Sequence, residues 1–259
     1  MDMKYGKIIF LSLCAILMAC SSDDQLSDGK AWIELDVSAG EDTRAVQTAT
    51  ELNDWTLIVT PTTTNDSYSG SASGVTAESF NPGVYAFQTY NYPSMQEAVA
   101  AGIDEFGKVW GAPYYTGEIE SQQLKVGGNA VSIACGRARN AQFKVLFNQS
   151  FTKIANITNY KVTADPDGRA LVFDETNVAT AAAYFMPDIE LRYKLSFSYE
   201  GVDKEAYGTV TLSAGKSSTL NVKANNTGTI SLSITYDDSW DEDVTGSVLI
   251  DAATGNKAN

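Results

Sequence analysis

IELRYKLSFSYE, residues Ile189–Glu200, shows the clearest structural pattern in the chain. Its odd-numbered positions hold Ile, Leu, Tyr, Leu, Phe and Tyr, and its even-numbered positions hold charged or hydroxyl side chains. Period-two alternation is typical of a β-strand that has one face in a core and the other in water. The stretch therefore predicts a long strand of an antiparallel sheet.

The same alternation recurs from Ala31 onward and predicts strands along most of the chain. A single short helix is expected at Met95–Ala101, because Ser94 and Glu97 have the spacing of a capping box and Gly102 follows as a terminator. The predicted strands, besides the one that begins at Ile189 and the one that follows it to Leu212, are Ile33–Val37, Trp55–Val59, Val84–Tyr90, Tyr115–Glu120, Ala130–Cys135, Phe143–Phe147, Tyr160–Ala164, Leu171–Phe173 and Ile230–Tyr236.

The fold class is therefore all-β, with antiparallel Ig-like sandwiches and one short helix. The chain has 259 residues, more than twice the roughly 100 of one sandwich, so two tandem domains are expected. We place them at residues 30–136 and 137–251, followed by a disordered tail at 252–259. A short internal repeat supports two copies of one sandwich type. Leu124–Gly128 and Leu212–Lys216 each join two predicted strands through a glycine-containing turn.

The composition excludes several classes of function. The net charge is −14, so the protein repels phosphate backbones and nucleic acid is not an expected partner. The chain contains no histidine, which removes Ser-His and Cys-His catalysis and His-ligated zinc. No enzyme activity is therefore expected.

An export signal occupies residues 1–19. Lys4 and Lys7 precede the apolar run Ile8–Ala19, the arrangement of a signal peptide, and the run is too short to span a bilayer. Leu17-Met18-Ala19-Cys20 resembles a bacterial lipobox, which makes Cys20 the expected site of lipid attachment. Several acyl chains on Cys20 would anchor the protein to a membrane permanently.

Residues 20–29 are expected to form a lipidated, flexible tether. Ser21-Ser22-Asp23-Asp24 resembles the acidic tag that sends lipoproteins of Bacteroides-type bacteria to the outer face of the outer membrane. The expected location is therefore the outer membrane, facing the cell exterior. Cys14 leaves with the signal and Cys20 is acylated, so Cys135 has no intrachain partner and is interpreted as a buried structural thiol.

No motif indicates a metal or a cofactor. Gly215-Lys216-Ser217 resembles the end of a phosphate-binding loop but lacks the earlier glycine, so we interpret it as a hairpin turn. Asp237–Asp243 carries five carboxylates, yet lacks the glycine and final glutamate of an EF-hand, which favours a solvated acidic loop over a calcium site.

Two groups of residues remain as candidate sites. Trp110, Tyr114 and Tyr115 lie in or beside a long connection, where aromatic side chains could stack on sugars or anchor a protein partner, or could cap the sandwich core. Arg44-Ala45 follows the first predicted strand among polar residues, and is either a proteolytic processing site or an ordinary loop.

The chain resembles a family of two-domain Bacteroides-type surface lipoproteins of unassigned function, related to the fimbrillin (type V pilin) superfamily. The resemblance covers nearly all of the mature chain. It rests on the lipobox at Cys20, Ala31–Val37, Thr43-Arg44-Ala45, Asn81–Tyr85 and Ala112–Gly117.

The resemblance implies tandem transthyretin-like sandwiches. It also implies proteolysis after Arg44, which would release the strand Ile33–Val37 and free a groove for a strand from another subunit. Two function classes follow: a structural or adhesive surface protein, such as a pilus component or accessory, and a surface glycan-binding lipoprotein that assists nutrient capture. Exposure of Trp110, Tyr114 and Tyr115 on one surface would favour the second class.

Overall fold

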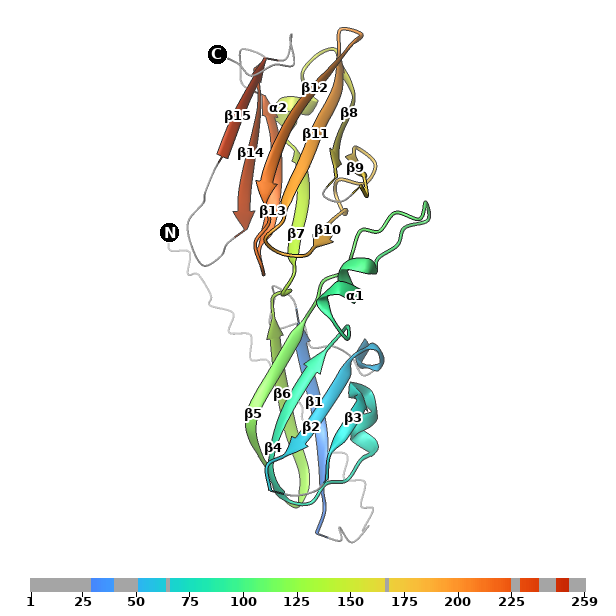
Figure 1. Cartoon of the computed structure of the whole chain (residues 1–259), viewed down its shortest axis with the longest axis vertical. Coiled ribbons are helices and arrows are strands. Elements are labelled where there is room, and N and C mark those ends of the chain that lie inside the picture. Colours follow the sequence, from blue (N-terminus) through green and yellow to red (C-terminus); the bar gives the residue numbers. More distant parts are fainter. Residues whose placement is uncertain are drawn as a thin grey trace, which may run out of the picture.

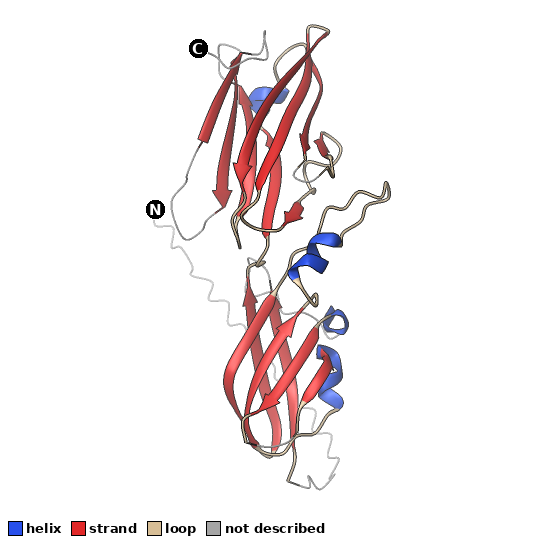
Figure 2. Cartoon of the chain, in the orientation of Figure 1, coloured by secondary structure: helices blue, strands red, loops and turns tan. Residues whose placement is uncertain are grey.

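The structure, a computed structural model, describes residues 29–39, 51–63, 66–165, 168–224, 229–237 and 246–251. Strands dominate these residues, and the few helices are short (Figure 2). The strands form two groups stacked along the long axis of the molecule (Figure 1). We call them the N-terminal half, which contains β1 to β6, and the C-terminal half, which contains β7 to β15. No helix of the described part is long and apolar enough to cross a bilayer.

The N-terminal half has a four-stranded antiparallel sheet and a separate strand pair that share one core. The pair is β1 with β6, and these two strands run parallel. The sheet has the order β3-β2-β4-β5. The elements of this half are β1 (Ala31–Ala39), η1 (Glu51–Asp54), β2 (Thr56–Pro61), β3 (Tyr68–Ser71), η2 (Ala72–Ala77), β4 (Gly83–Tyr90), α1 (Met95–Ala100), β5 (Thr116–Leu124) and β6 (Gly127–Gly136).

The C-terminal half repeats this path and adds strands to it. Its antiparallel sheet has the order β9-β8-β11-β12, and its second sheet has the order β10-β7-β13-β14-β15, in which β7 and β13 run parallel. The elements are β7 (Ala141–Phe147), α2 (Gln149–Thr152), β8 (Ile157–Ala164), β9 (Leu171–Asp174), β10 (Ala183–Phe185), β11 (Glu190–Tyr199), β12 (Val202–Thr211), β13 (Ser217–Ala224), β14 (Thr229–Asp237) and β15 (Gly246–Asp251).

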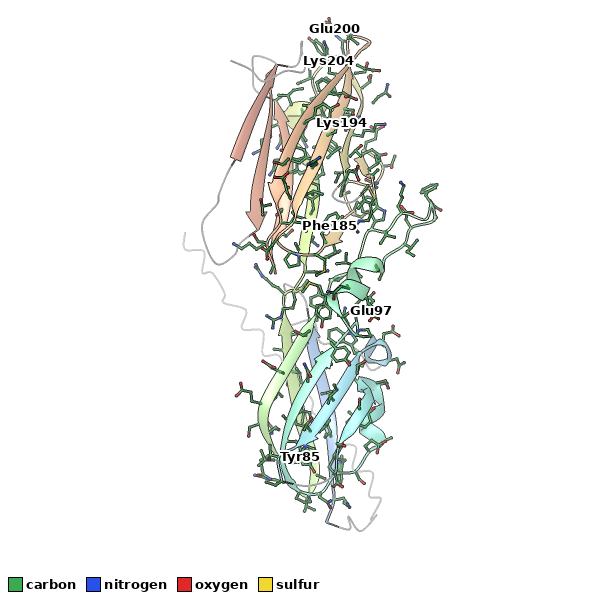
Figure 3. All side chains as sticks on the ribbon, viewed as in Figure 1. Tyr85, Glu97, Phe185, Lys194, Glu200 and Lys204 are labelled. Carbon is green, nitrogen blue, oxygen red and sulfur yellow. The ribbon has the colours of Figure 1, made fainter. Side chains whose placement is uncertain are left out.

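The expected all-β, sandwich-like fold is confirmed, and β11 shows why the alternation predicts it. Leu191, Tyr193, Leu195 and Phe197 are buried, whereas Lys194 between them lies on the outer face. Each half has its own cluster of buried side chains. Tyr85 lies in the N-terminal cluster, and Phe185 lies at the end of the C-terminal cluster that faces the junction (Figure 3).

The short helix α1 also follows from its sequence. The Ser94 side chain caps it by accepting a hydrogen bond from the Glu97 backbone N–H at 3.2 Å. The helix ends at Ala100, and Gly102 turns the chain away with a φ of 65°.

The turn at Gly215-Lys216-Ser217 is not the hairpin turn that the sequence indicates. β12 and β13, which it joins, belong to different sheets, and the same is true of β5 and β6 around Lys125-Val126. Both turns carry the chain across the core, so that β6 lies parallel to β1 and β13 lies parallel to β7. The internal repeat at Leu124–Gly128 and Leu212–Lys216 therefore corresponds to the same crossing between sheets in each half.

Candidate functional site: a pinned hairpin at the junction

No cluster of metal-ligating side chains is present in the part of the chain that the structure describes. Those residues contain no group of three or more Cys, Asp or Glu side chains placed to hold a metal ion. Cys135 is buried, and burial raises the pKa of its thiol to about 11, so the thiol stays protonated and unreactive at neutral pH.

The structure describes only some of the predicted site residues. Cys20, Arg44 and Ala45 lie outside the described residues. Tyr115 is half-buried and stacks on Trp55, with ring centroids 6.1 Å apart. Trp110 is half-buried too, and packs edge-on against Phe173 at 5.1 Å. These two aromatic side chains therefore contact different halves rather than forming one exposed surface.

Tyr114, the third aromatic residue, belongs to the link between the halves. Its backbone N–H donates to Asn140 Oδ1 at 3.1 Å, and its carbonyl accepts from the Arg139 N–H at 2.7 Å. Asn140 is buried and also donates from Nδ2 to the Ala112 carbonyl at 2.9 Å. The side chain of Asn140 thus joins the connection Ala112–Tyr114 to the start of β7.

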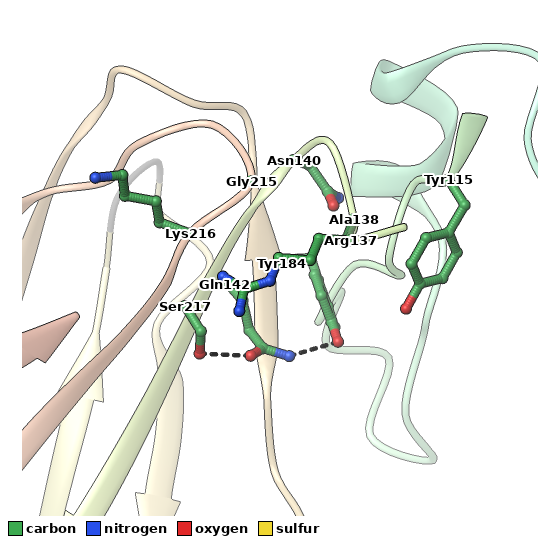
Figure 4. Close-up of a pocket in the computed structure, with 9 residues that line it drawn as sticks. All are labelled: Tyr115, Arg137, Ala138, Asn140, Gln142, Tyr184, Gly215, Lys216 and Ser217. Atoms are coloured by element: carbon green, nitrogen blue, oxygen red, sulfur yellow. Dashed lines mark hydrogen bonds between the residues drawn. The ribbon is translucent and has the colours of Figure 1, made fainter. Parts of the chain in front are cut away.

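A small polar cavity lies beside this link, with a volume of about 50 Å³ (Figure 4). Gln142 crosses it, accepting from Ser217 Oγ at 2.6 Å and donating to the Tyr184 hydroxyl. A cavity of this size holds a few water molecules but no sugar or side chain of a partner. The cavity is therefore a structural feature of the junction.

A larger feature begins directly after α1, where residues 102–111 form a hairpin that projects beside the C-terminal half (Figure 1). The neck of this hairpin is made by Gly102 and Gly111. A Cβ on Gly102 would lie 2.2 Å from the Gly111 carbonyl oxygen, and both glycines have positive φ. Only glycine permits this close approach of the two backbones.

Asp104 fixes the conformation of the hairpin. Its Oδ1 accepts from the backbone N–H groups of Phe106 (2.9 Å) and Lys108 (2.8 Å), and its Oδ2 accepts from Trp110 Nε1 at 2.8 Å. The indole N–H of Trp110, followed by the two backbone donors, holds the pKa of Asp104 below its usual value. Asp104 is half-buried and belongs to neither core cluster, so this pinning acts on the hairpin rather than on the core.

The hairpin is also attached to the C-terminal half. The Tyr184 N–H donates to the Trp110 carbonyl at 2.7 Å, and Lys108 Nζ donates to the Arg169 carbonyl at 3.2 Å. Arg169 in turn donates from Nη1 to the Val109 carbonyl at 3.2 Å and lies over the Phe185 ring, 4.4 Å from its centroid. The hairpin is therefore attached to the C-terminal half along its second arm, residues 108–110.

An open cleft of about 420 Å³ lies between this hairpin and the turn at residues 176–182. Phe106, at the tip of the hairpin, is 81% exposed and forms part of the cleft wall. Ile103 on the same hairpin is 65% exposed but does not line the cleft. The other lining residues are Asp104, Glu105, Trp110, Thr176, Asn177, Thr180, Ala181 and Ala182.

Phe106 is the candidate residue that the sequence analysis missed. Its signal was present: Ile103 and Val109 flank an Asp104-x-x-Gly107 turn, which is typical of a tight hairpin with an exposed tip. Of the aromatic candidates chosen from the sequence, Trp110 and Tyr115 use their rings for packing, against Phe173 and Trp55.

We expect Asp104→Ala to loosen the hairpin without unfolding the protein. The change removes three hydrogen bonds to the carboxylate, so amide hydrogen exchange at Phe106 and Lys108 should become faster by about tenfold or more. Glu105→Ala is the matched control and should leave both amides unchanged.

The same loosening is expected at low pH. A depressed folded-state pKa stabilises the pinned hairpin above the ordinary Asp pKa, and this contribution is lost as the pH falls through the lowered value. Exchange rates that are equal in Asp104→Ala and the parent protein would contradict the pinning role.

The strand order and the two buried clusters define an all-β, sandwich-like protein. The chain belongs to the family described as Domain of unknown function (DUF4493), whose model matches residues 29–252. The expectation of a family without an assigned function is thereby confirmed. No curated protein matches the chain.

Several solved structures resemble this fold at low similarity. A fimbrial assembly protein from Parabacteroides distasonis is 10% identical, with 82% of this chain and 98% of that chain covered and a TM-score of 0.41. A protein from Bacteroides eggerthii, provisionally named a cell adhesion protein, is 12% identical, with coverages of 76% and 87% and a TM-score of 0.37. A second protein with that provisional name, from Bacteroides fragilis, is 13% identical, with coverages of 83% and 100% and a TM-score of 0.32.

Proposed function

We propose that this protein is a non-enzymatic surface lipoprotein with a structural or adhesive role, anchored to the outer membrane by lipid on Cys20 and facing the cell exterior. The lipobox and the polar tether after it support the anchor. The proposed organisation is the signal peptide 1–19, the tether 20–29, the domains 30–136 and 137–251, and the tail 252–259. The proposed partners are the membrane and other surface or pilus subunits that exchange a strand with it.

The proposed strand exchange rests on a difference in strand pairing between the two halves. In the C-terminal half, β13 has a partner on each side, β7 and β14. Its counterpart β6 pairs with β1 alone among the described residues. An unpaired strand edge beside an apolar core is a site where a strand from another chain can add.

β1 itself has the properties of a replaceable strand. It places Ala31, Ile33 and Val37 in the core, yet nearly all of its backbone pairing is with β6. Removing β1 would therefore expose both an apolar groove and a full row of β6 hydrogen-bonding groups. Arg44-Ala45, shortly after the end of β1 at Ala39, is the proposed processing site that would permit the removal.

The test is the N-terminal state and size of the protein recovered from cells of its own type. If the proposal holds, a fraction of the protein begins at Ala45 and migrates as SDS-resistant ladders, and Arg44→Ala abolishes both. Arg192→Ala, which changes an exposed arginine elsewhere, should have no effect. Cys20→Ala should release the protein from the membrane fraction.

The outcomes separate the two parts of the proposal. An exclusively monomeric protein with lipidated Cys20 would overturn strand exchange and leave the anchored surface role. A protein that is not lipidated at Cys20 would overturn the anchor.

A further inference from the structure

We propose that the cleft between the hairpin 102–111 and the turn 176–182 binds a neutral oligosaccharide, with the Phe106 ring as its stacking platform and the Glu105 carboxylate as its hydrogen-bond acceptor. This inference deepens the proposed surface role by naming a ligand class. It does not depend on strand exchange.

The aromatic surface is the first requirement of a sugar site, and Phe106 supplies it. Phe106 is 81% exposed, and the hydrogen bond from its backbone N–H to Asp104 Oδ1 fixes the backbone that carries the ring. A phenylalanine on a fixed backbone offers a large apolar contact area at low conformational cost, because its side chain has only two rotatable bonds. Trp110 adds a second aromatic side chain deeper in the cleft, where its position is set by Phe173.

The charge of the cleft decides which kind of sugar fits. Asp104 and Glu105 line it, and no lysine or arginine does. The whole chain carries a net charge of −14, so a sulfated or uronate-bearing glycan would be repelled. A neutral sugar carries no such penalty.

The hydrogen-bonding groups of the cleft point to hydroxyl-rich ligands. Asp104 uses both of its carboxylate oxygens within the hairpin, whereas Glu105 makes no hydrogen bond with the described part of the chain. The hydroxyls of Thr176 and Thr180 donate to Asp174 and to the Asn177 carbonyl, and each keeps acceptor capacity. An ionised carboxylate beside an aromatic ring can accept hydroxyl protons while the ring covers the apolar face of the sugar.

The dimensions favour a small ligand over a protein. A volume of about 420 Å³ is within the range of roughly 300–1,000 Å³ of small-ligand sites. A stable protein interface needs about 800 Å² on each partner with an apolar centre. Here Phe106 is the one fully exposed apolar side chain of the cleft, Trp110 and two alanines are half-buried, and the other lining residues are polar or acidic.

The test is calorimetric titration of the full mature protein in detergent with neutral hexaoses of β-1,4-glucose, α-1,4-glucose, β-1,4-mannose, β-1,4-galactose and β-1,4-xylose. We expect at least one of them to bind. Phe106→Ala and Glu105→Gln should each weaken that binding by about tenfold or more, and Phe106→Trp should retain it. Ile103→Ala is the matched control, because Ile103 is exposed on the same hairpin but outside the cleft.

Three results would overturn the proposal. The first is no binding of any neutral hexaose at millimolar concentration. The second is binding that Phe106→Ala and Ile103→Ala affect equally. The third is Phe106-dependent binding of hexagalacturonate or decalysine in place of the neutral sugars, which would assign the cleft to an acidic glycan or to a basic protein segment.

Failure here is distinguishable from failure of the proposed function. The titration uses monomeric protein and reports only on the cleft, whereas ladders and the Ala45 N-terminus report only on strand exchange. A Phe106→Ala protein that still forms ladders, and an Arg44→Ala protein that still binds the hexaose, would show that the two properties are independent.

Discussion

Replacement of Phe173 by alanine is expected to lower the free energy of unfolding by about 3–5 kcal/mol, the usual range for a buried phenylalanine. Phe173 is fully buried and lies between two other aromatic rings, Phe143 at 5.7 Å and Trp110 at 5.1 Å. Truncation would leave a cavity in the C-terminal core and remove the ring on which Trp110 rests. Phe173→Ala should therefore have two effects: it destabilises the C-terminal half, and it weakens the packing of the hairpin against that half.

Urea unfolding followed by tryptophan fluorescence measures both effects, because Trp110 lies at the altered site. Phe106→Ala is the matched control: it removes the same side chain from an exposed position, and should change the free energy of unfolding by no more than about 0.5 kcal/mol. Equal losses in the two variants would contradict the placement of Phe173 in the core and Phe106 at the surface.

The local elements of the fold could be predicted because their information lies within a few residues. The strand β11 is recognisable from alternation alone, and α1 from the spacing of Ser94 and Glu97. Each pattern reflects a short-range physical requirement, either a buried face or a capped helix end.

The pairing of strands was harder to predict because it depends on residues far apart in the sequence. β1 lies parallel to β6, and β7 lies parallel to β13. A glycine-containing turn between two strands has the same sequence signature whether the strands pair with each other or cross to opposite sheets. For that reason the local pattern at Gly215-Lys216-Ser217 predicts a hairpin turn, although β12 and β13 belong to different sheets.

The candidate site shows the same division between local and long-range information. The sequence places Trp110, Tyr114 and Tyr115 in or beside a connection, and all three lie between α1 and β5, with Tyr115 directly before β5. Whether such rings face water depends on partners such as Trp55 and Phe173, which no local pattern identifies. Phe106 stays exposed because the Asp104 turn directs it away from both cores.

The arrangement of the hairpin has a consequence for the protein as a whole. Residues 102–111 come from the N-terminal half, yet the hairpin attaches to the C-terminal half through the Trp110 carbonyl and through Arg169. Its orientation is therefore set by contacts with both halves. If the cleft binds the ligand proposed above, this attachment lowers the conformational entropy that binding costs relative to a mobile loop.

Ile33→Ala is the second change with a large expected effect, because β1 contributes the core residues on which the proposed strand exchange depends. Ile33 is 1% exposed, and replacing a buried isoleucine by alanine costs about 2–5 kcal/mol. The loss should fall on the N-terminal half, since Ile33 belongs to that core cluster. Glu34→Ala, one position along the strand on its exposed face, should cost no more than about 0.5 kcal/mol.

The same pair of variants tests whether β1 can leave the fold. The Trp32 side chain lies over Gly128 on β6, where an added Cβ would meet its Nε1 at 3.0 Å, so β1 is held by this surface contact as well as by its buried face. If β1 detaches locally, weaker packing of Ile33 raises the population of the open state, and limited trypsin digestion after Arg44 should release β1 faster in Ile33→Ala than in Glu34→Ala. If instead β1 separates only when the whole half unfolds, trypsin will cut throughout residues 30–136 at the rate of global unfolding. Release of β1 with the remaining N-terminal half intact therefore supports a replaceable strand, and digestion of the entire half in a single phase contradicts it.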